Sequence, residues 1–241
     1  MINQATTDSV VIMPKIEKHK FLLVNILKDI YSDTLYGPIL GLKGGTAAYL
    51  FYGLPRFSVD LDFDLLDVKK EKFVLDKIKE ILEGYGEIKD IRKKRFTLFF
   101  LLSYDETSQN IKVEISKRKF PNHYQIKNYL GIPMLIMQKD DMFSHKLVAL
   151  LERKNIASRD LFDLYYFMKN NWQVNKKLVE LRTGIKFKEY LKQTIRAMEK
   201  FDETYILQGM GELLDSKQKL WVKDNLKKEL LFLLKFYSEN N

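Results

Sequence analysis

The sequence predicts an α+β protein in which a mixed β-sheet flanked by helices is followed by a C-terminal helical bundle. Up to residue 125, helical periodicities alternate with short apolar or alternating runs that are typical of strands. From residue 126 onward the pattern is almost wholly helical. Because mixed elements come first and helices second, we predict two domains, at residues 1–125 and 126–241.

The elements expected in the first part follow from apolar spacing. Apolar residues every three or four positions predict helices at 15–32 and 69–83, and Gly84 ends the second. A short helix is expected from Thr46. The expected strands cover residues 38–43, 60–66, 87–93, 96–102 and 111–116.

The second part is expected to hold only helices, apart from an extended piece near residues 133–136. The predicted helices cover residues 140–153, 159–170, 174–182, 186–200, 203–214 and 217–237. Their number and spacing are typical of a bundle.

The composition is that of a globular chain with a sizeable core. Apolar residues make up 46% and aromatic residues 13% of the chain, which excludes a disordered protein. The chain has no cysteine and only three scattered histidines, which excludes disulfides and disfavours a zinc site. Residues 1–8 lack the regions of a signal peptide, and no run approaches the ~18 apolar residues of a membrane span. We therefore expect a soluble, cytoplasmic protein without a membrane partner.

A Gly-Gly pair follows the strand expected at residues 38–43. Gly44 and Gly45 lack side chains, so backbone N–H groups can approach a phosphate closely. Thr46 is placed to cap the helix that follows, and the start of a helix favours an anion. The pattern is typical of a phosphate-binding turn, although Gly-Gly also occurs wherever a chain bends.

Fourteen residues separate this pair from an acidic motif, Asp60-Leu61-Asp62. On a strand, the carboxylates of Asp60 and Asp62 project from one face, and two hard oxygen donors on one face suit Mg²⁺. The apolar residues between them disfavour a calcium-binding loop. Asp64 continues the same face, and we expect it to be solvated at the end of the strand.

Together these motifs resemble the nucleotidyltransferase superfamily, and more closely the AbiEii/AbiGii toxin group of bacterial type IV toxin–antitoxin and phage-abortive systems. The residues that carry the resemblance are Leu42, Lys43, Gly44, Gly45, Thr46 and Ala47, followed by Arg56, Ser58, Asp60, Asp62 and Phe63. A second block is similar to the group's downstream motif, with Lys146, Leu147, Ala149, Leu150, Arg153, Arg159, Asp160, Leu161, Asp163 and Leu164. The resemblance implies a nucleotidyltransferase fold and transfer of a nucleoside monophosphate from an NTP to an acceptor hydroxyl.

The resemblance also implies the roles of these residues. Asp60, Asp62 and Glu114 would be catalytic and would hold two Mg²⁺ ions, for which Mn²⁺ could substitute. Glu114 is chosen because it lies between Val113 and Ile115 in an apolar-acid-apolar pattern, although an exposed strand glutamate remains the alternative. The remaining candidates are Lys146 and Asp160 as catalytic residues, and Gly44, Gly45, Thr46, Arg56, Ser58, Arg153 and Asp163 as substrate-binding residues.

The net charge of +9 favours a phosphate-rich acceptor. Residues 1–125 hold 20 basic and 17 acidic residues and residues 126–241 hold 21 and 15, so their net charges are +3 and +6. Basic clusters at 92–95 and 117–119 suit an RNA, of which tRNA is one that the resemblance implies. A cognate antitoxin is a further partner that the resemblance implies. A protein that binds nucleotide or RNA without turnover, and an enzyme that modifies a small molecule, remain alternatives.

Overall fold

The computed structural model describes residues 5–105 and 109–240, and the side chains from residue 15 onward. The expectation that residues 1–8 are not a signal peptide falls partly on residues 1–4, which lie outside the described residues. The chain forms two compact units by contact. The first holds residues 1–51, 58–119 and 124–136, and the second holds residues 52–57, 120–123 and 137–241. Segments of the two units therefore alternate along the sequence. The division into two domains at residues 1–125 and 126–241 stays a prediction.

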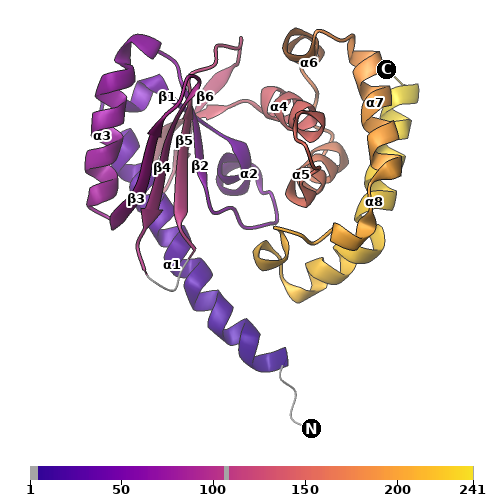
Figure 1. Ribbon diagram of the computed structural model, residues 1–241, viewed down its shortest axis with the longest axis horizontal. Helices are drawn as coiled ribbons and strands as arrows, with labels where there is room; N and C mark the ends of the chain where they lie inside the picture. The colour runs from indigo at the N-terminus through magenta and orange to yellow at the C-terminus, as the bar shows by residue number, and fades with distance from the viewer. Residues whose placement is uncertain (1–4, 106–108, 241) are drawn as a thin grey trace. The chain divides into compact units, whose positions relative to one another are not determined.

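The first unit is built around a mixed sheet (Figure 1). Its strands are β1 (Leu40–Lys43), β2 (Leu61–Leu65), β3 (Glu87–Lys93), β4 (Thr97–Ser103), β5 (Ile111–Ser116), β6 (Tyr124–Tyr129) and β7 (Ile132–Met137), in the order β3-β4-β5-β2-β1-β7-β6. Its helices are α1 (Ala5–Ser32), α2 (Gly44–Tyr52) and α3 (Glu71–Glu83). The pairs β2–β5 and β1–β7 are parallel, whereas β1–β2, β3–β4 and β4–β5 are antiparallel.

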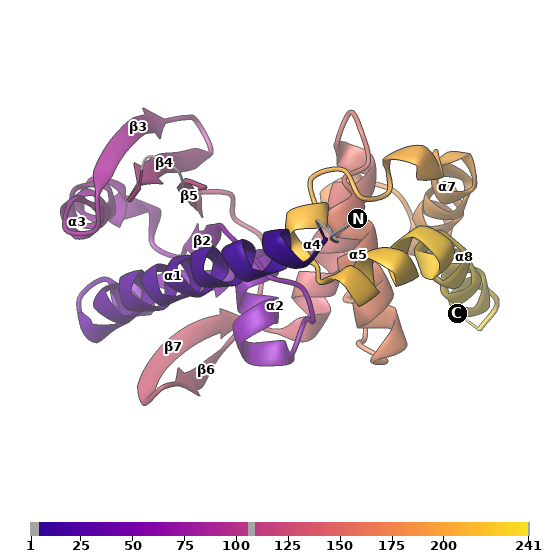
Figure 2. The same cartoon turned by 90° about the horizontal axis from the view of Figure 1, so that it is seen from below.

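Helices α1 and α3 cover one face of this sheet (Figures 1 and 2). The ring of Tyr31 on α1 lies 6.5 Å from that of Phe63, and Ile78 on α3 is fully buried, as are Phe100 and Val113 of the strands. Each such side chain contributes about 1.5–3 kcal/mol when it is fully buried. The acidic side chains of β2 alternate with these apolar ones, so they point to the opposite face.

The second unit is helical, as the sequence predicted. Its helices are α4 (Lys139–Glu152), α5 (Ser158–Lys169), α6 (Lys176–Thr183), α7 (Phe187–Lys200) and α8 (Ser216–Glu239). Helix α4 packs against α5 and α6, and α8 packs against α5 and α7. Leu147, Leu161 and Leu230 are among the fully buried residues of this core.

Two sequence predictions were wrong. Strand β7 matches the extended piece expected near residues 133–136, but strand β6 was not expected in this almost wholly helical part; Leu130 and Gly131, with φ of 49° and 83°, join the two strands. The single helix expected at 203–214 is instead two 3₁₀ turns, Glu203–Tyr205 and Gly211–Leu213, separated by Gly209 with φ of 67°. Gly209, in the left-handed region, interrupts the helix that apolar spacing alone favours at 203–214.

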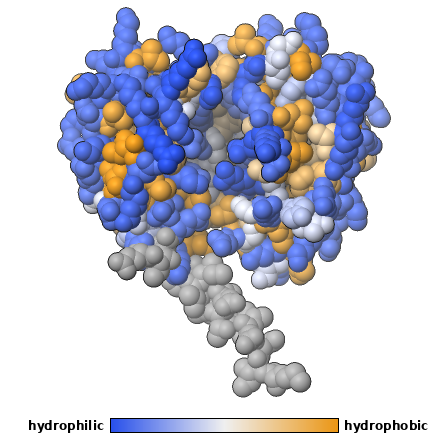
Figure 3. All heavy atoms as spheres, viewed as in Figure 1, coloured by the Kyte–Doolittle hydropathy of each residue, from blue (hydrophilic) through white to orange (hydrophobic). Residues whose placement is uncertain are grey.

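Hydrophilic residues cover most of the face of the molecule drawn in Figure 3, and apolar ones form scattered patches among them. No helix of the described residues is long and apolar enough to cross a membrane.

Candidate active site

The register of the sheet brings three candidate acidic residues together in the first unit. In the parallel pair β2–β5, Asp62 is directly opposite Glu114, and Asp60 immediately precedes β2. Opposite residues of paired strands point to the same face, so the carboxylates of Asp62 and Glu114 are neighbours. Glu114 is exposed, and Asp60 and Asp62 are half-buried. Strand pairing therefore brings Asp62 and Glu114 together, although they are far apart in the sequence.

Gly44 links the glycine pair to these acids. Helix α2 begins at Gly44 directly after β1, and Lys43, the last residue of β1, is opposite Asp62. Gly44 has a φ of 74°, and a Cβ added there would lie 2.6 Å from the Asp62 Oδ2. The first N–H groups of a helix have no partner within the helix and carry its positive end. The acid and the anion-favouring helix start are thus in contact.

This contact gives a prediction. Gly44→Ala should lower the catalytic rate strongly, because the added methyl group must displace the Asp62 carboxylate. Gly184→Ala is a matched control, since Gly184 has a similar φ of 70° but nothing within 4 Å of the added Cβ. Both variants should lose about 1 kcal/mol of stability from backbone strain. Thermal unfolding and nucleotidyl transfer, measured on both, check this. Equal loss of activity in the two variants would contradict the steric explanation.

The segment that enters β2 is fixed by two side chains. The Thr46 hydroxyl donates to the Asp60 carbonyl oxygen at 2.5 Å, and the His19 Nε2 donates to the Val59 carbonyl oxygen at 2.9 Å. The prediction that Thr46 caps the helix was wrong, because α2 begins two residues earlier and Thr46 bonds to β2 instead. Ser58, another candidate, is buried in this segment.

His19 is a residue that the sequence reasoning missed. It is buried on α1, and its Nδ1 accepts from the Tyr104 hydroxyl at 2.8 Å. Burial lowers the pKa of His19, against the effect of its bond to Val59, so the ring is neutral at pH 7. The sequence did contain a signal that His19 is buried, because residue 19 falls four positions before Leu23 on the apolar stripe of the predicted helix.

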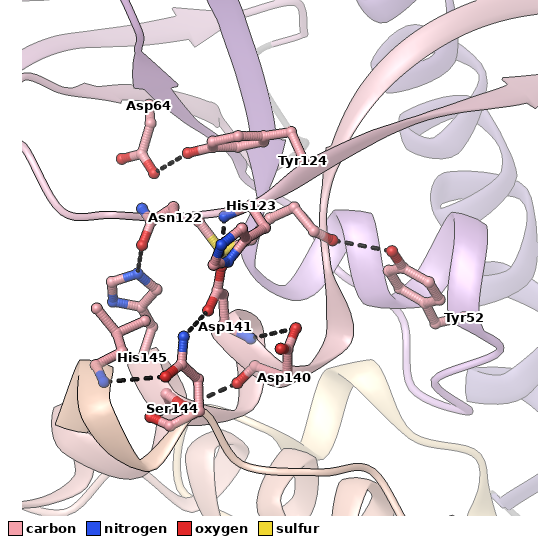
Figure 4. Close-up of polar contacts among 12 residues, drawn as sticks. Tyr52, Asp64, Asn122, His123, Tyr124, Asp140, Asp141, Ser144 and His145 are labelled. Atoms are coloured by element: carbon pink, nitrogen blue, oxygen red, sulfur yellow. Dashed lines mark hydrogen bonds and ion pairs between the residues drawn. The ribbon is translucent and has the colours of Figure 1, made fainter.

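Asp64 is not solvated, contrary to expectation. Its carboxylate pairs with the Lys43 Nζ at 2.5 Å and accepts from the Tyr124 hydroxyl at 2.6 Å, as Figure 4 shows for Tyr124. Tyr124 lies on β6, a strand that was not expected from the sequence, and its ring packs so closely on Gly41 that a Cβ there would clash with it. The charge of Asp64 is therefore already paired within the first unit. Its bonds to Lys43 and Tyr124 order the face of the sheet beside Asp62.

The donor set fits Mg²⁺ bound together with a substrate. Among the described residues, no group of three His, Asp or Glu side chains forms a ready-made metal cage. Mg²⁺ does not need one, because it is usually held by one or two carboxylates plus phosphate and water oxygens. Asp62 beside the exposed Glu114, with Asp60 next to the strand, supplies such carboxylates.

The second sequence block forms a charge network within the second unit. The Lys146 Nζ lies 2.8 Å from the Asp160 Oδ1 and 2.9 Å from the Asp163 Oδ2. The Arg56 Nε and Nη2 donate to both oxygens of Asp163, at 2.6 and 2.7 Å. The Arg153 Nε lies 2.9 Å from the Asp160 Oδ2. All five members are candidates from the sequence.

Burial makes this network costly to break. Asp160 and Asp163 are fully buried, Arg56 is 3% exposed, and the side chain of Lys146 is only 17% exposed. Burial would raise the pKa of Asp163, but Arg56 and Lys146 hold it below its usual value. Burial likewise opposes a charged Lys146, yet Asp160 and Asp163 raise its pKa. Lys146 therefore belongs to a buried ion-pair network and is not a solvated surface lysine.

A further buried acid, Asp141, organises the start of α4. Its Oδ2 accepts from the His123 backbone N–H and lies 3.0 Å from the His123 Nδ1, and its Oδ1 accepts from the Asn175 amide at 2.7 Å (Figure 4). These bonds fix the short segment 120–123 to the helices of its unit.

The basic clusters differ in how far they are neutralised. The Lys117 Nζ lies 2.8 Å from Glu71, and its side chain is only 9% exposed, so the expected cluster at 117–119 loses this member. Lys93 also pairs with Glu71, at 3.3 Å. In the described part of the chain, Lys94, Arg95 and Arg118 form no ion pair with a carboxylate.

Comparison with known proteins identifies the family and the fold. A family described as the nucleotidyl transferase AbiEii toxin of type IV toxin–antitoxin systems matches residues 25–227. Two solved structures from Helicobacter pylori share the fold: a candidate nucleotidyltransferase and the protein JHP933, each with a TM-score of 0.60 and 23% identity. The alignments cover 92% of this chain and 94% of the first protein, and 93% of this chain and 92% of JHP933. No functionally curated protein matches the chain.

Proposed function

The chain belongs to the AbiEii toxin family of nucleotidyltransferases, and we propose that it transfers a nucleoside monophosphate from an NTP to a hydroxyl group of an RNA, of which a tRNA is the first candidate. The observation that carries the proposal is the contact between Gly44 and Asp62, with Glu114 opposite Asp62. This contact joins an anion-favouring helix start to a pair of carboxylates, which is the arrangement that an NTP and Mg²⁺ require together.

In the proposed reaction, the first N–H groups of α2, at Gly44, Gly45 and Thr46, bind the outer phosphates. The oxygen of the acceptor hydroxyl attacks the α-phosphorus and its proton passes to water. The bond between the α- and β-phosphates breaks, and pyrophosphate leaves with the bonding electrons. Asp60, Asp62 and Glu114 would hold Mg²⁺, which supplies charge neutralisation and lowers the pKa of the hydroxyl.

The family description places these proteins in type IV toxin–antitoxin systems. We therefore include growth inhibition and a cognate antitoxin in the proposal, with the cytoplasm as the site of action. The roles of Lys146, Arg153, Asp160 and Asp163 in transfer rest on the family resemblance and remain part of the proposal. Arg56, a further candidate, is held within its unit by its buried ion pair with Asp163.

The test is incubation of the purified protein with each labelled NTP, Mg²⁺ and total RNA. We expect one or a few nucleotides to become covalently attached to RNA, with release of pyrophosphate and complete loss of transfer in a chelator. RNA affinity should fall steeply with salt, because binding cations to phosphates releases counterions. Labelling of a small molecule with none of RNA would support the small-molecule alternative, and RNA binding without NTP consumption would support a binding protein.

A further inference from the structure

A row of side chains extends from the acids across the open face of the sheet. Asp62 on β2 is opposite Glu114 on β5, Glu114 is opposite Phe99 on β4, and Phe99 is opposite Arg92 on β3. These strands lie side by side in Figure 1. Because directly opposite residues point to the same face, the Phe99 ring is the neighbour of Glu114 on the side away from Asp62.

Phe99 is an unusual residue for this position. It is half-buried, whereas the next residue, Phe100, is fully buried on the opposite face. The Arg92 Cζ lies 5.8 Å and the Lys94 Nζ 5.5 Å from the centre of the Phe99 ring. Arg92 is 61% exposed and also pairs with Asp90 at 2.6 Å. An aromatic ring bordered by exposed cations combines a stacking surface with charges for a phosphate.

The order of the strands decides which substrate this ring faces. The glycine turn lies on the β1 side of Asp62, whereas Glu114, Phe99 and Arg92 lie on its β5 side. With the outer phosphates of the NTP at Gly44, the leaving pyrophosphate is on the β1 side. In-line displacement places the attacking oxygen opposite the leaving group. The acceptor therefore approaches from the side of Glu114 and Phe99, two strands or about 10 Å from Asp62.

We propose that Phe99 is a stacking platform for a base of the RNA acceptor, next to the nucleotide that carries the attacking hydroxyl, with Arg92 and Lys94 contacting the backbone phosphates. The inference rests on the proposed function, because it uses the position of the NTP phosphates. An exposed cation–π contact is weaker than the stacking of a base on an aromatic ring. A base can thus displace the two cations from the ring.

The experiment measures RNA affinity and NTP affinity separately. The probes are a short fluorescein-labelled poly(U) RNA and a fluorescent NTP with Mg²⁺, read by fluorescence anisotropy on the full chain. Phe99→Leu keeps an apolar side chain but removes the aromatic face, and Phe99→Trp keeps it. We expect Phe99→Leu to weaken RNA binding about 10-fold with unchanged NTP affinity, and Phe99→Trp to retain RNA binding. Lys117→Ala is the control, since its charge already pairs with Glu71, and should have no effect.

Unchanged RNA affinity in Phe99→Leu would overturn the proposal, and so would no RNA binding by the wild-type chain. Loss of NTP affinity instead of RNA affinity would assign the ring to the donor and would also overturn it. The proposed function fails independently, in the transfer assay: if the wild type binds RNA through Phe99 but transfers no nucleotide to it, the platform stands and the function does not.

Discussion

Replacing Asp60 and Asp62 together by Asn is expected to abolish nucleotidyl transfer, with a loss of at least about 1,000-fold, while the chain stays folded. Asn keeps the size of each side chain but removes the charges that would hold Mg²⁺. Neither residue is part of the core, since both are half-buried, and the buried neighbours Leu61 and Phe63 are untouched. Transfer from labelled NTP and thermal unfolding measure the two effects.

Asp76→Asn on α3 is the matched control. Asp76 is exposed, and within the described residues its one ion pair is with Lys72, at 3.5 Å, so its loss should change neither activity nor stability. The toxicity that the family membership implies should disappear with the double variant and persist with the control. Undiminished transfer by the double variant would remove Asp60 and Asp62 from the proposed catalytic centre.

Replacing Asp163 by Ala is expected to lower the free energy of unfolding by about 3–5 kcal/mol. Asp163 is fully buried and bonds to Arg56 through two oxygens and to Lys146 through one. Its removal leaves the Arg56 guanidinium buried without its carboxylate, and desolvating an unpaired charge is costly. Chemical denaturation of the wild type and the variant measures the difference.

The ion pairs of Asp163 with Arg56 and Lys146 also predict that the free energy of unfolding depends on pH. The folded-state pKa of Asp163 is lowered by Arg56 and Lys146 despite burial. Its stabilisation is therefore fully present above the unfolded pKa, near 3.9, and is lost as pH falls through the folded value. The difference in unfolding free energy between wild type and Asp163→Ala should shrink as pH falls below about 4. A difference that does not change with pH would contradict a charged Asp163.

Arg153→Ala provides the contrast within the same network. The Arg153 side chain is 44% exposed, and Asp160 keeps its bond to Lys146, so the loss should be less than about 1 kcal/mol. If Arg153→Ala nevertheless reduces transfer strongly, its role is in substrate binding, as the family resemblance implies. If Asp163→Ala is as stable as the wild type, the network is not a structural element.

The sequence by itself identified the candidate site residues and predicted most of the helices and strands. The Gly-Gly pair, the Asp-x-Asp motif and the alternation around Glu114 are local patterns, and strand alternation fixes which side chains share a face. The family follows from the same patterns, and the family match over residues 25–227 confirms it. Helical periodicity likewise predicted α3, α4 and α8, because each buries one stripe of its own residues.

Only the tertiary structure decided which of these residues meet. Strand register set Glu114 opposite Asp62 and Phe99 beside Glu114, and no local pattern encodes the register between strands far apart in sequence. The same holds for burial: Asp64 and Lys146 look like solvated charges in the sequence, but both are paired by partners from distant segments. The cost of burying a charge depends on such partners, so their roles could be assigned only once the folded chain had brought them together.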